Sequence, residues 1–167
     1  MPKDLLGIVA RVNALSLTLI TPEFYRVRRL RTAKASKIDY DQTSFRMKTE
    51  GMQVDGLNIR IATNRKPGRP TVLFLSPLPQ SILCYDEVWA DLSDKNLDLV
   101  ALDVPGFGRS DGDTSLMNFL AQSAFLAKFI AALDLREVHI VAPDIAMPVA
   151  MHYAMSPDHK ARSLLVG

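Results

Sequence analysis

The sequence predicts an α/β fold in which an antiparallel hairpin leads into a mostly parallel sheet. Short apolar runs alternate with helical segments between residues 71 and 166, which is the pattern of βαβ units. Strand-like alternation with Gly-containing turns precedes them. Three of the predicted strands are followed by loops of unusual sequence, and ligands bind at such strand ends.

The composition fits one globular domain with a substantial core. The chain has 167 residues, of which 48% are hydrophobic. Its net charge of +2 gives no general reason to expect a nucleic-acid partner. The single cysteine, Cys84, excludes an internal disulfide and fits a reducing compartment. We interpret Cys84 as a packing or partly exposed residue, because no charged surroundings are evident that would activate its thiol.

Residues 1–43 form a separate N-terminal segment, predicted as an apolar helix followed by a basic stretch. Residues 5–20 are apolar but shorter than the roughly 20 residues that cross a bilayer. The basic residues are Arg26, Arg28, Arg29, Arg31, Lys34 and Lys37. We favour a helix packed on the domain or on a partner. The alternative is peripheral contact with an anionic membrane surface. We expect a cytoplasmic protein, membrane-associated if this alternative holds.

Two segments with alternating apolar and polar residues predict the strands of the hairpin. They are residues 45–48 and 57–61, and each places its apolar side chains on one face. Gly51 and the Asp55-Gly56 pair supply turn residues between them.

The rest of the chain alternates strands with helices. In chain order we predict a strand at 71–75, a helix at 86–92, a strand at 97–102, a helix at 116–133, a strand at 137–141, a helix at 145–155 and a strand beginning at 163. The run at 71–75 is apolar at every position, as expected of a strand buried on both faces.

Residues 138–150 combine a short strand, an abrupt turn and a helix, with Asp144 at the turn. Ala142 and Ala146 lie two positions to either side. Small residues at these positions are required by the tight turn of a nucleophile elbow, so the pattern predicts that Asp144 is a nucleophile. The alternative is an inert Asp144 whose carboxylate caps the following helix.

The loop at 103–111 reads Asp-Val-Pro-Gly-Phe-Gly-Arg-Ser-Asp. We interpret Asp103 and Asp111 as carboxylates that brace this loop. The loop resembles the D-x-P-G-x-G-x-S-D segment of the α/β-hydrolase superfamily, and the elbow follows one helix and one strand later, as in that family. The resemblance covers roughly residues 45–167. It implies that residues 44–167 are the N-terminal part of an α/β-hydrolase domain, cut before the lid and the last strands.

Asp at the elbow resembles the Asp-nucleophile branch of this superfamily, the epoxide hydrolases and the haloalkane and haloacetate dehalogenases. The resemblance implies that Asp144 attacks a carbon electrophile, forming an ester that activated water hydrolyses. It also implies an oxyanion hole made by the backbone amides of Leu78 and Ile145. The sequence has no Walker-type Gly-rich loop with a Lys and no Cys/His cluster with metal spacing, so we expect no cofactor and no metal.

The sequence departs from the family pattern at several positions. Ala142 and Ala146 replace the elbow glycines, and Ser76-Pro77 replaces a His-Gly pair. Ile145 stands where haloalkane dehalogenases commonly carry a halide-binding Trp, which puts that activity in doubt.

The family order of catalytic residues is nucleophile, acid and then His. His152 and His159 follow Asp144 but are not placed to return to it, and His139 is interpreted as structural. We therefore expect the catalytic His and acid to lie beyond Gly167 in a longer protein. The resemblance implies a hydrolase of small molecules, with epoxides or carbon–halogen bonds as targets. The alternative is a non-catalytic α/β-hydrolase-like binding or scaffold protein.

Overall fold

The computed structural model describes residues 45–167, so the segment 1–43 and its membrane alternative lie outside the described residues. The strands are β1 (Glu50–Val54), β2 (Leu57–Asn64), β3 (Thr71–Leu75), β4 (Asp98–Leu102), β5 (Val138–Ala142) and β6 (Ala161–Val166). The helices are the short 3-10 helix η1 (Ile82–Tyr85), α3 (Asp86–Ser93), the 3-10 helix η2 (Thr114–Leu116), α4 (Phe119–Ala132) and α5 (Ala146–Ala154).

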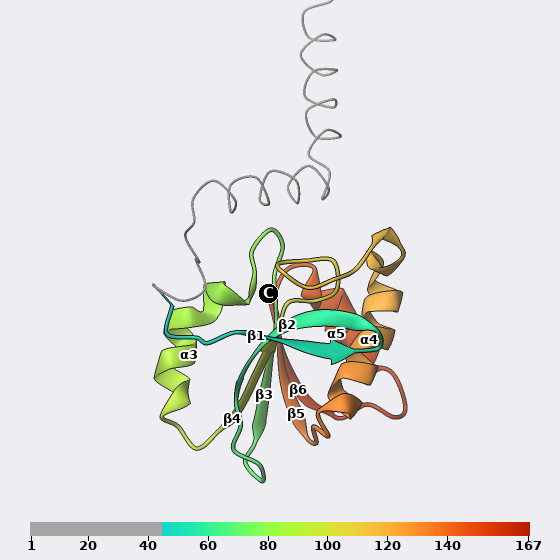
Figure 1. Cartoon of the computed structure of the whole chain (residues 1–167). Coiled ribbons are helices and arrows are strands. Elements are labelled where there is room, and N and C mark those ends of the chain that lie inside the picture. The colour runs from blue at the N-terminus through green and yellow to red at the C-terminus, as the bar shows by residue number, and fades with distance from the viewer. Residues whose placement is uncertain (1–44) are drawn as a thin grey trace, which may run out of the picture. The chain divides into compact units, whose positions relative to one another are not determined.

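The six strands form one mixed sheet in the order β1-β2-β4-β3-β5-β6. β1 pairs with β2 and β2 with β4 in antiparallel fashion, whereas β4, β3, β5 and β6 run parallel. Helix α3 covers one face of the sheet, and α4 and α5 cover the other (Figure 1). The predicted α/β class, with a parallel sheet led by an antiparallel hairpin, is confirmed.

Side chains of the central strands fill two hydrophobic cores, one on each face of the sheet. Leu73 and Leu75 point into the core that contains Phe129 of α4. Phe74, between them in sequence, points into the other core beside Trp89 of α3, with ring centroids 6.1 Å apart. Because successive strand residues face opposite ways, β3 must be apolar at every position.

The prediction for the first arm of the hairpin was wrong. The strand is β1 rather than residues 45–48, and Gly51 lies inside β1 opposite Arg60 instead of in a turn. Met47 is fully buried, and its N–H donates to Asp86 Oδ1 at 2.7 Å. The alternation at 45–48 therefore reflects packing beside α3 and not sheet pairing. The predicted turn at Asp55-Gly56 is confirmed.

Helix α4 begins at Phe119, three residues later than predicted. Leu116 belongs to η2, and Asn118 separates the two helices. The Asn118 side chain accepts a hydrogen bond from the Ala121 N–H, which fixes the start of α4 there. No helix within residues 45–167 is both long enough and apolar enough to cross a membrane.

Candidate active site

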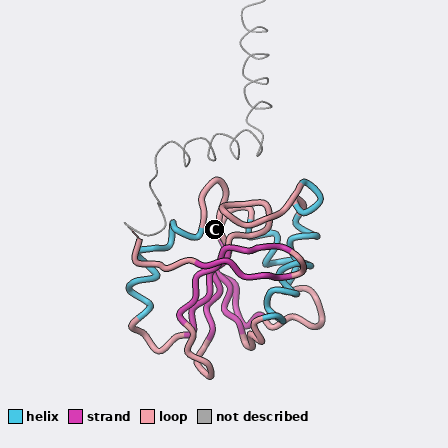
Figure 2. Tube along the Cα trace, viewed as in Figure 1, coloured by secondary structure: helices cyan, strands magenta, loops and turns pink. Residues whose placement is uncertain are grey.

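Loops from three neighbouring parallel strands gather at one end of the sheet (Figure 2). They follow β3, β4 and β5, and the third contains the turn at Asp144. Since the strands are parallel, their carboxyl ends lie at the same edge. The three segments singled out in the sequence are therefore brought to one edge of the sheet.

The turn between β5 and α5 holds Asp144 in a left-handed backbone conformation, with φ of 54°. Ala142 and Ala146 are almost completely buried on either side of it. Larger side chains at these two positions would have no space, so the small residues permit the turn. The Asp144 N–H donates to the Gly167 carbonyl oxygen at 2.7 Å, which ties the turn to the end of β6.

The Asp144 carboxylate does not cap α5. The N-cap of this helix is Ile145, and no side-chain hydrogen bond caps it. In its first turn the Ala146 N–H donates to the Pro143 carbonyl oxygen, and the Met147 N–H donates to the Asp144 carbonyl oxygen. Backbone carbonyls therefore satisfy these amides, and the carboxylate is left for another partner.

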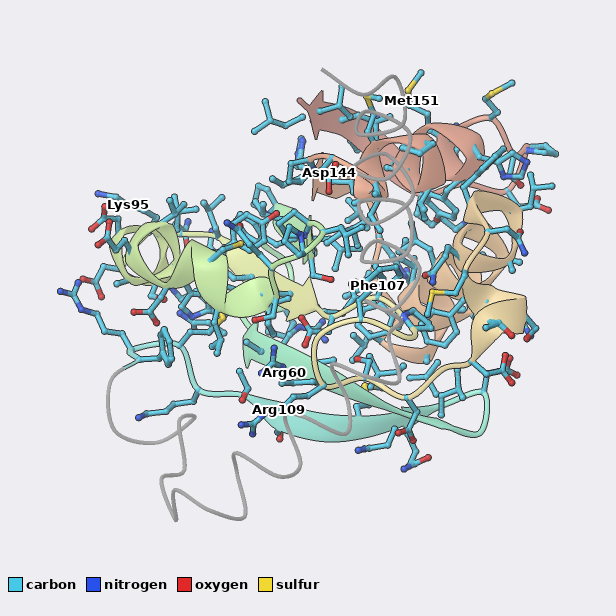
Figure 3. The ribbon with its side chains drawn as sticks, turned by 90° about the horizontal axis from the view of Figure 1, so that it is seen from above. Arg60, Lys95, Phe107, Arg109, Asp144 and Met151 are labelled. Atoms are coloured by element: carbon cyan, nitrogen blue, oxygen red, sulfur yellow. The ribbon has the colours of Figure 1, made fainter. Side chains whose placement is uncertain are left out.

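That partner is the backbone amide of Leu78, which donates to Asp144 Oδ2 at 2.9 Å. Leu78 lies 66 positions earlier, in the loop after β3. The second carboxylate oxygen, Oδ1, has no hydrogen-bond partner among residues 45–167. Asp144 is exposed, and Figure 3 shows it at the start of α5, away from Arg60 and Arg109. One oxygen of this exposed residue is thus held by a hydrogen bond, and the other is not.

Of the two predicted oxyanion-hole amides, the structure brings Leu78 to Asp144. Ile145 follows Asp144 directly in the chain, and its amide makes no hydrogen bond to this carboxylate. Its place at the first turn of α5 puts this amide on the same tight turn as the carboxylate.

The loop after β4 is braced by two carboxylates, as interpreted from the sequence. Asp103 is fully buried and accepts hydrogen bonds from Arg60 Nε at 2.6 Å and from the Arg109 N–H at 2.9 Å. Asp111 Oδ2 accepts the Asn58 N–H at 3.0 Å, and the Asp111 N–H donates to the Asn58 carbonyl oxygen. Both carboxylates fasten the loop to β2.

The role of Arg60 was not predicted from the sequence. The alternation at 57–61 places Arg60 on the polar face, yet only 6% of its surface is exposed. Its guanidinium pairs with Asp103 across 43 positions of sequence. Burial raises the pKa of the Asp103 carboxyl, and the charge of Arg60 opposes this effect. No local pattern signals such a long-range pair.

The histidines His139 and His152 bond to serines instead of to Asp144. His139 Nδ1 is 2.8 Å from Ser163 Oγ, and His152 Nδ1 is 2.9 Å from Ser123 Oγ. Each pair joins neighbouring elements of the fold. In the part of the chain that the structure describes, no cluster of three or more His, Cys, Asp or Glu side chains could hold a metal ion.

Residues 70–165 match the family described as alpha/beta hydrolase fold. The chain belongs to this family. No curated protein is significantly similar to it in sequence. The family assignment agrees with the mostly parallel sheet, and it confirms the superfamily resemblance.

Solved structures with the same fold have different activities in their names. An epoxide hydrolase from Vigna radiata is 20% identical, with a TM-score of 0.65 over 72% of this chain and 39% of that protein. A bacterial membrane phospholipase A is 23% identical, with a TM-score of 0.66 over 99% and 51%. A lipase described as putative, from Acinetobacter baumannii, is 20% identical, with a TM-score of 0.63 over 72% and 40%. At these identities the likeness shows the fold alone, and the chain spans about half or less of each protein's length.

Proposed function

We propose that the protein is a hydrolase in which Asp144 attacks a carbon electrophile, with epoxides or carbon–halogen bonds as its substrates. The observation that carries this proposal is the hydrogen bond from the Leu78 N–H to Oδ2 of the exposed residue Asp144, whose Oδ1 accepts no hydrogen bond within residues 45–167. A carboxylate held by one oxygen presents the other in a fixed direction. It needs no base to act as a nucleophile, unlike a serine hydroxyl.

In the first step, Oδ1 forms a bond to carbon while the bond from that carbon to the epoxide oxygen or the halogen breaks. The leaving atom takes the electron pair, and an epoxide oxygen also takes up a proton from solvent water. The product is an ester of Asp144. The attack places Oδ1 in the ester bond and leaves Oδ2 as the carbonyl oxygen, where the Leu78 N–H already points.

In the second step, water adds to the ester carbon and negative charge develops on Oδ2. Amide donors aimed at that position stabilise the charge, which is the role we assign to Leu78 and Ile145. Collapse releases the alcohol and restores the carboxylate. We assign neither the His that activates the water nor its acid partner to residues 45–167.

The surroundings of Asp144 favour uncharged, apolar substrates. Leu78 and Met147 are 47% and 38% exposed, and both contact the Asp144 turn through their backbone amides. Ile145 is half-buried beside them. A small neutral molecule can bury its apolar surface against these side chains while its carbon faces Oδ1.

A non-catalytic binding protein is the second candidate. It is favoured by the observation that neither His139 nor His152, each bonded to a serine, lies against Asp144. An elbow without a base to activate water supports at most one round of alkylation.

The test compares Asp144→Asn with Asp134→Asn in the protein. Asp134 is the matched control, because it is also an exposed Asp with positive φ, of 47°, and follows α4. We expect Asp144→Asn to abolish turnover of an epoxide and haloalkane panel and Asp134→Asn to preserve it. A single turnover in ¹⁸O-labelled water should place ¹⁸O in the peptide that carries Asp144. Turnover by Asp144→Asn, once deamidation is excluded by mass spectrometry, would contradict the proposal.

A further inference from the structure

The loop that carries Leu78 is anchored at its first residue by Ser76. The Ser76 N–H donates to the Leu102 carbonyl oxygen at 3.1 Å, and Ser76 Oγ accepts the Val104 N–H at 3.1 Å. Ser76 has only 1% of its surface exposed. A single small residue therefore bonds to both sides of the junction between β4 and the loop that follows it.

The far end of the same loop is anchored by Asp103. Asp103 Oδ1 accepts the Ile82 N–H at 2.8 Å, and both residues are fully buried. Asp103 Oδ2 is occupied by the Arg60 side chain and by the Arg109 N–H. Each carboxylate oxygen thus has its own donors, and the negative charge has a buried cation beside it.

Between these anchors the loop has little else to hold it. Pro77 and Pro79 lack an N–H and cannot donate. The Leu78 amide donates its hydrogen bond to Asp144, and the Leu78 side chain is 47% exposed. The position of the Leu78 amide must therefore follow from where the two ends of the loop are fixed.

We propose that Asp103 and Ser76 are positioning residues for the Asp144 site, which they control by aiming the Leu78 amide at Oδ2. The inference rests on the proposed function only in assigning that amide a part in the reaction. This inference gives the Arg60–Asp103 pair, which braces the loop after β4, a role in the chemistry at Asp144, after β5.

Asp103→Asn removes the anchor with little change of shape. A carboxylate accepts on both oxygens, whereas an amide accepts on one side and donates from the other. The side-chain amide of this variant cannot accept from Ile82 on one side and from Arg60 and Arg109 on the other. At least one of these donors then faces the N–H₂ group, which is itself a donor. We expect the end of the loop to move in response.

Asp98 provides a matched control at the opposite end of β4. It is 2% exposed, and its carboxylate accepts Arg65 Nε at 2.9 Å and the Lys66 N–H at 2.7 Å. Asp98→Asn therefore damages another pair of a buried Asp with an Arg, at the other end of β4, without touching the Leu78 loop. Any effect common to both variants reports loss of stability and not positioning.

The experiment follows the amide resonance of Leu78 by NMR in the ¹⁵N-labelled protein. Asp103→Asn should move its proton upfield, as a weakened hydrogen bond requires, and Ser76→Ala should move it in the same direction. Asp98→Asn should leave it in place. With a slow-releasing epoxide, the rate at which Asp144 is alkylated should fall about 10- to 100-fold in Asp103→Asn, since misplacing a group by about 1 Å has an effect of this size. In Asp98→Asn it should fall less than about twofold.

A Leu78 resonance that is unmoved in Asp103→Asn and Ser76→Ala would overturn the proposal, as would an equal shift in Asp98→Asn. If Asp103→Asn does not fold, Ser76→Ala decides by itself, because it releases the other end of the loop. If Asp144 of the unmodified protein forms no adduct, the proposed function fails, while the NMR comparison still decides whether Asp103 and Ser76 aim the amide.

Discussion

The backbone at Asp144 has φ of 54°, a conformation that is unfavourable for residues other than glycine. Its carboxylate is bonded to Leu78 and not to the amides of α5. We therefore expect Asp144→Gly to unfold with a free energy no lower than that of the unmodified protein, while losing all turnover. Urea unfolding measures the first quantity and the substrate panel the second. A loss of more than about 1 kcal/mol would show instead that the hydrogen bond from the Leu78 N–H to the carboxylate supports the fold.

Gly108 illustrates a different constraint, a close approach to a buried carboxylate. A Cβ at this position would lie 1.8 Å from Asp103 Oδ2, and φ is +54°. Because Asp103 is held by Arg60, it cannot move aside. We expect Gly108→Ala to lower the free energy of unfolding by about 3 kcal/mol, the upper end of the range for most point mutations.

The matched control for this prediction is Gly68→Ala. Gly68 also has positive φ, of +83°, but a Cβ there would meet nothing within 4 Å. Gly68→Ala should lower the free energy of unfolding by about 1 kcal/mol, which is the effect of the backbone conformation alone. Equal losses in the two variants, measured by urea unfolding, would contradict the role given to Asp103.

Cys84 is exposed, yet its thiol is predicted to react slowly. Desolvation, and secondly the charge of Asp103, raises the pKa of this thiol above its ordinary value of 9.0. The thiolate is the reactive form, so the pH profile of iodoacetamide labelling should have its midpoint above that of the unfolded chain. The folded state favours the neutral thiol, and its contribution to stability is lost as pH rises from 9.0 toward the raised pKa. A midpoint at or below that of the unfolded chain would contradict this.

Among the elements, α4 depends on Asn118 at its start. The Asn118 Oδ1 accepts the Ala121 N–H at 2.9 Å. Asn118→Ala should lower the free energy of unfolding by about 1 kcal/mol, the usual effect of losing an N-cap. Asn118→Asp keeps an acceptor at this position and should retain most of the stability. Equal stability of the Ala and Asp variants in urea would show that the hydrogen bond does not set the start of the helix.

Elements were predictable where a local pattern has one physical cause. Residues 71–75 were predicted to the residue, because a strand buried on both faces leaves an uninterrupted apolar run. Residues 45–48 were not, because alternation also arises when an extended segment packs beside a helix, as Met47 does near Asp86. Leu116 was assigned to α4 because its apolar character continues that of the helix, although Asn118 ends the continuity.

The candidate site, too, was predictable from the sequence where it depends on a local pattern and not where it depends on long-range contacts. The turn at Asp144 is local, and its small neighbours were readable from the sequence. The interaction of Leu78 with Asp144 was expected only through the family resemblance, since 66 positions separate the two residues. The Arg60–Asp103 pair was not predicted, because it depends on the order in which β2, β4 and β3 pair in the sheet.

At the scale of the whole molecule, β6 is an edge strand that carries exposed apolar side chains. It lies at one end of the sheet order and pairs with β5 within the described chain. Leu165 and Val166 are 67% and 42% exposed on it. An apolar edge strand is a template for pairing with another chain. We expect the 167-residue chain to self-associate as its concentration rises, which sedimentation velocity measures.

The edge of β6 can be distinguished from general surface hydrophobicity with two variants. Leu165→Lys places a charge on the strand itself and should reduce self-association, with little loss of stability because the side chain is exposed. Met155→Lys changes a side chain that is 81% exposed just beyond α5 and should leave association unchanged. Equal effects of the two variants would assign association to exposed apolar surface in general. A chain that stays monomeric at all concentrations would show that the edge of β6 is not a pairing surface.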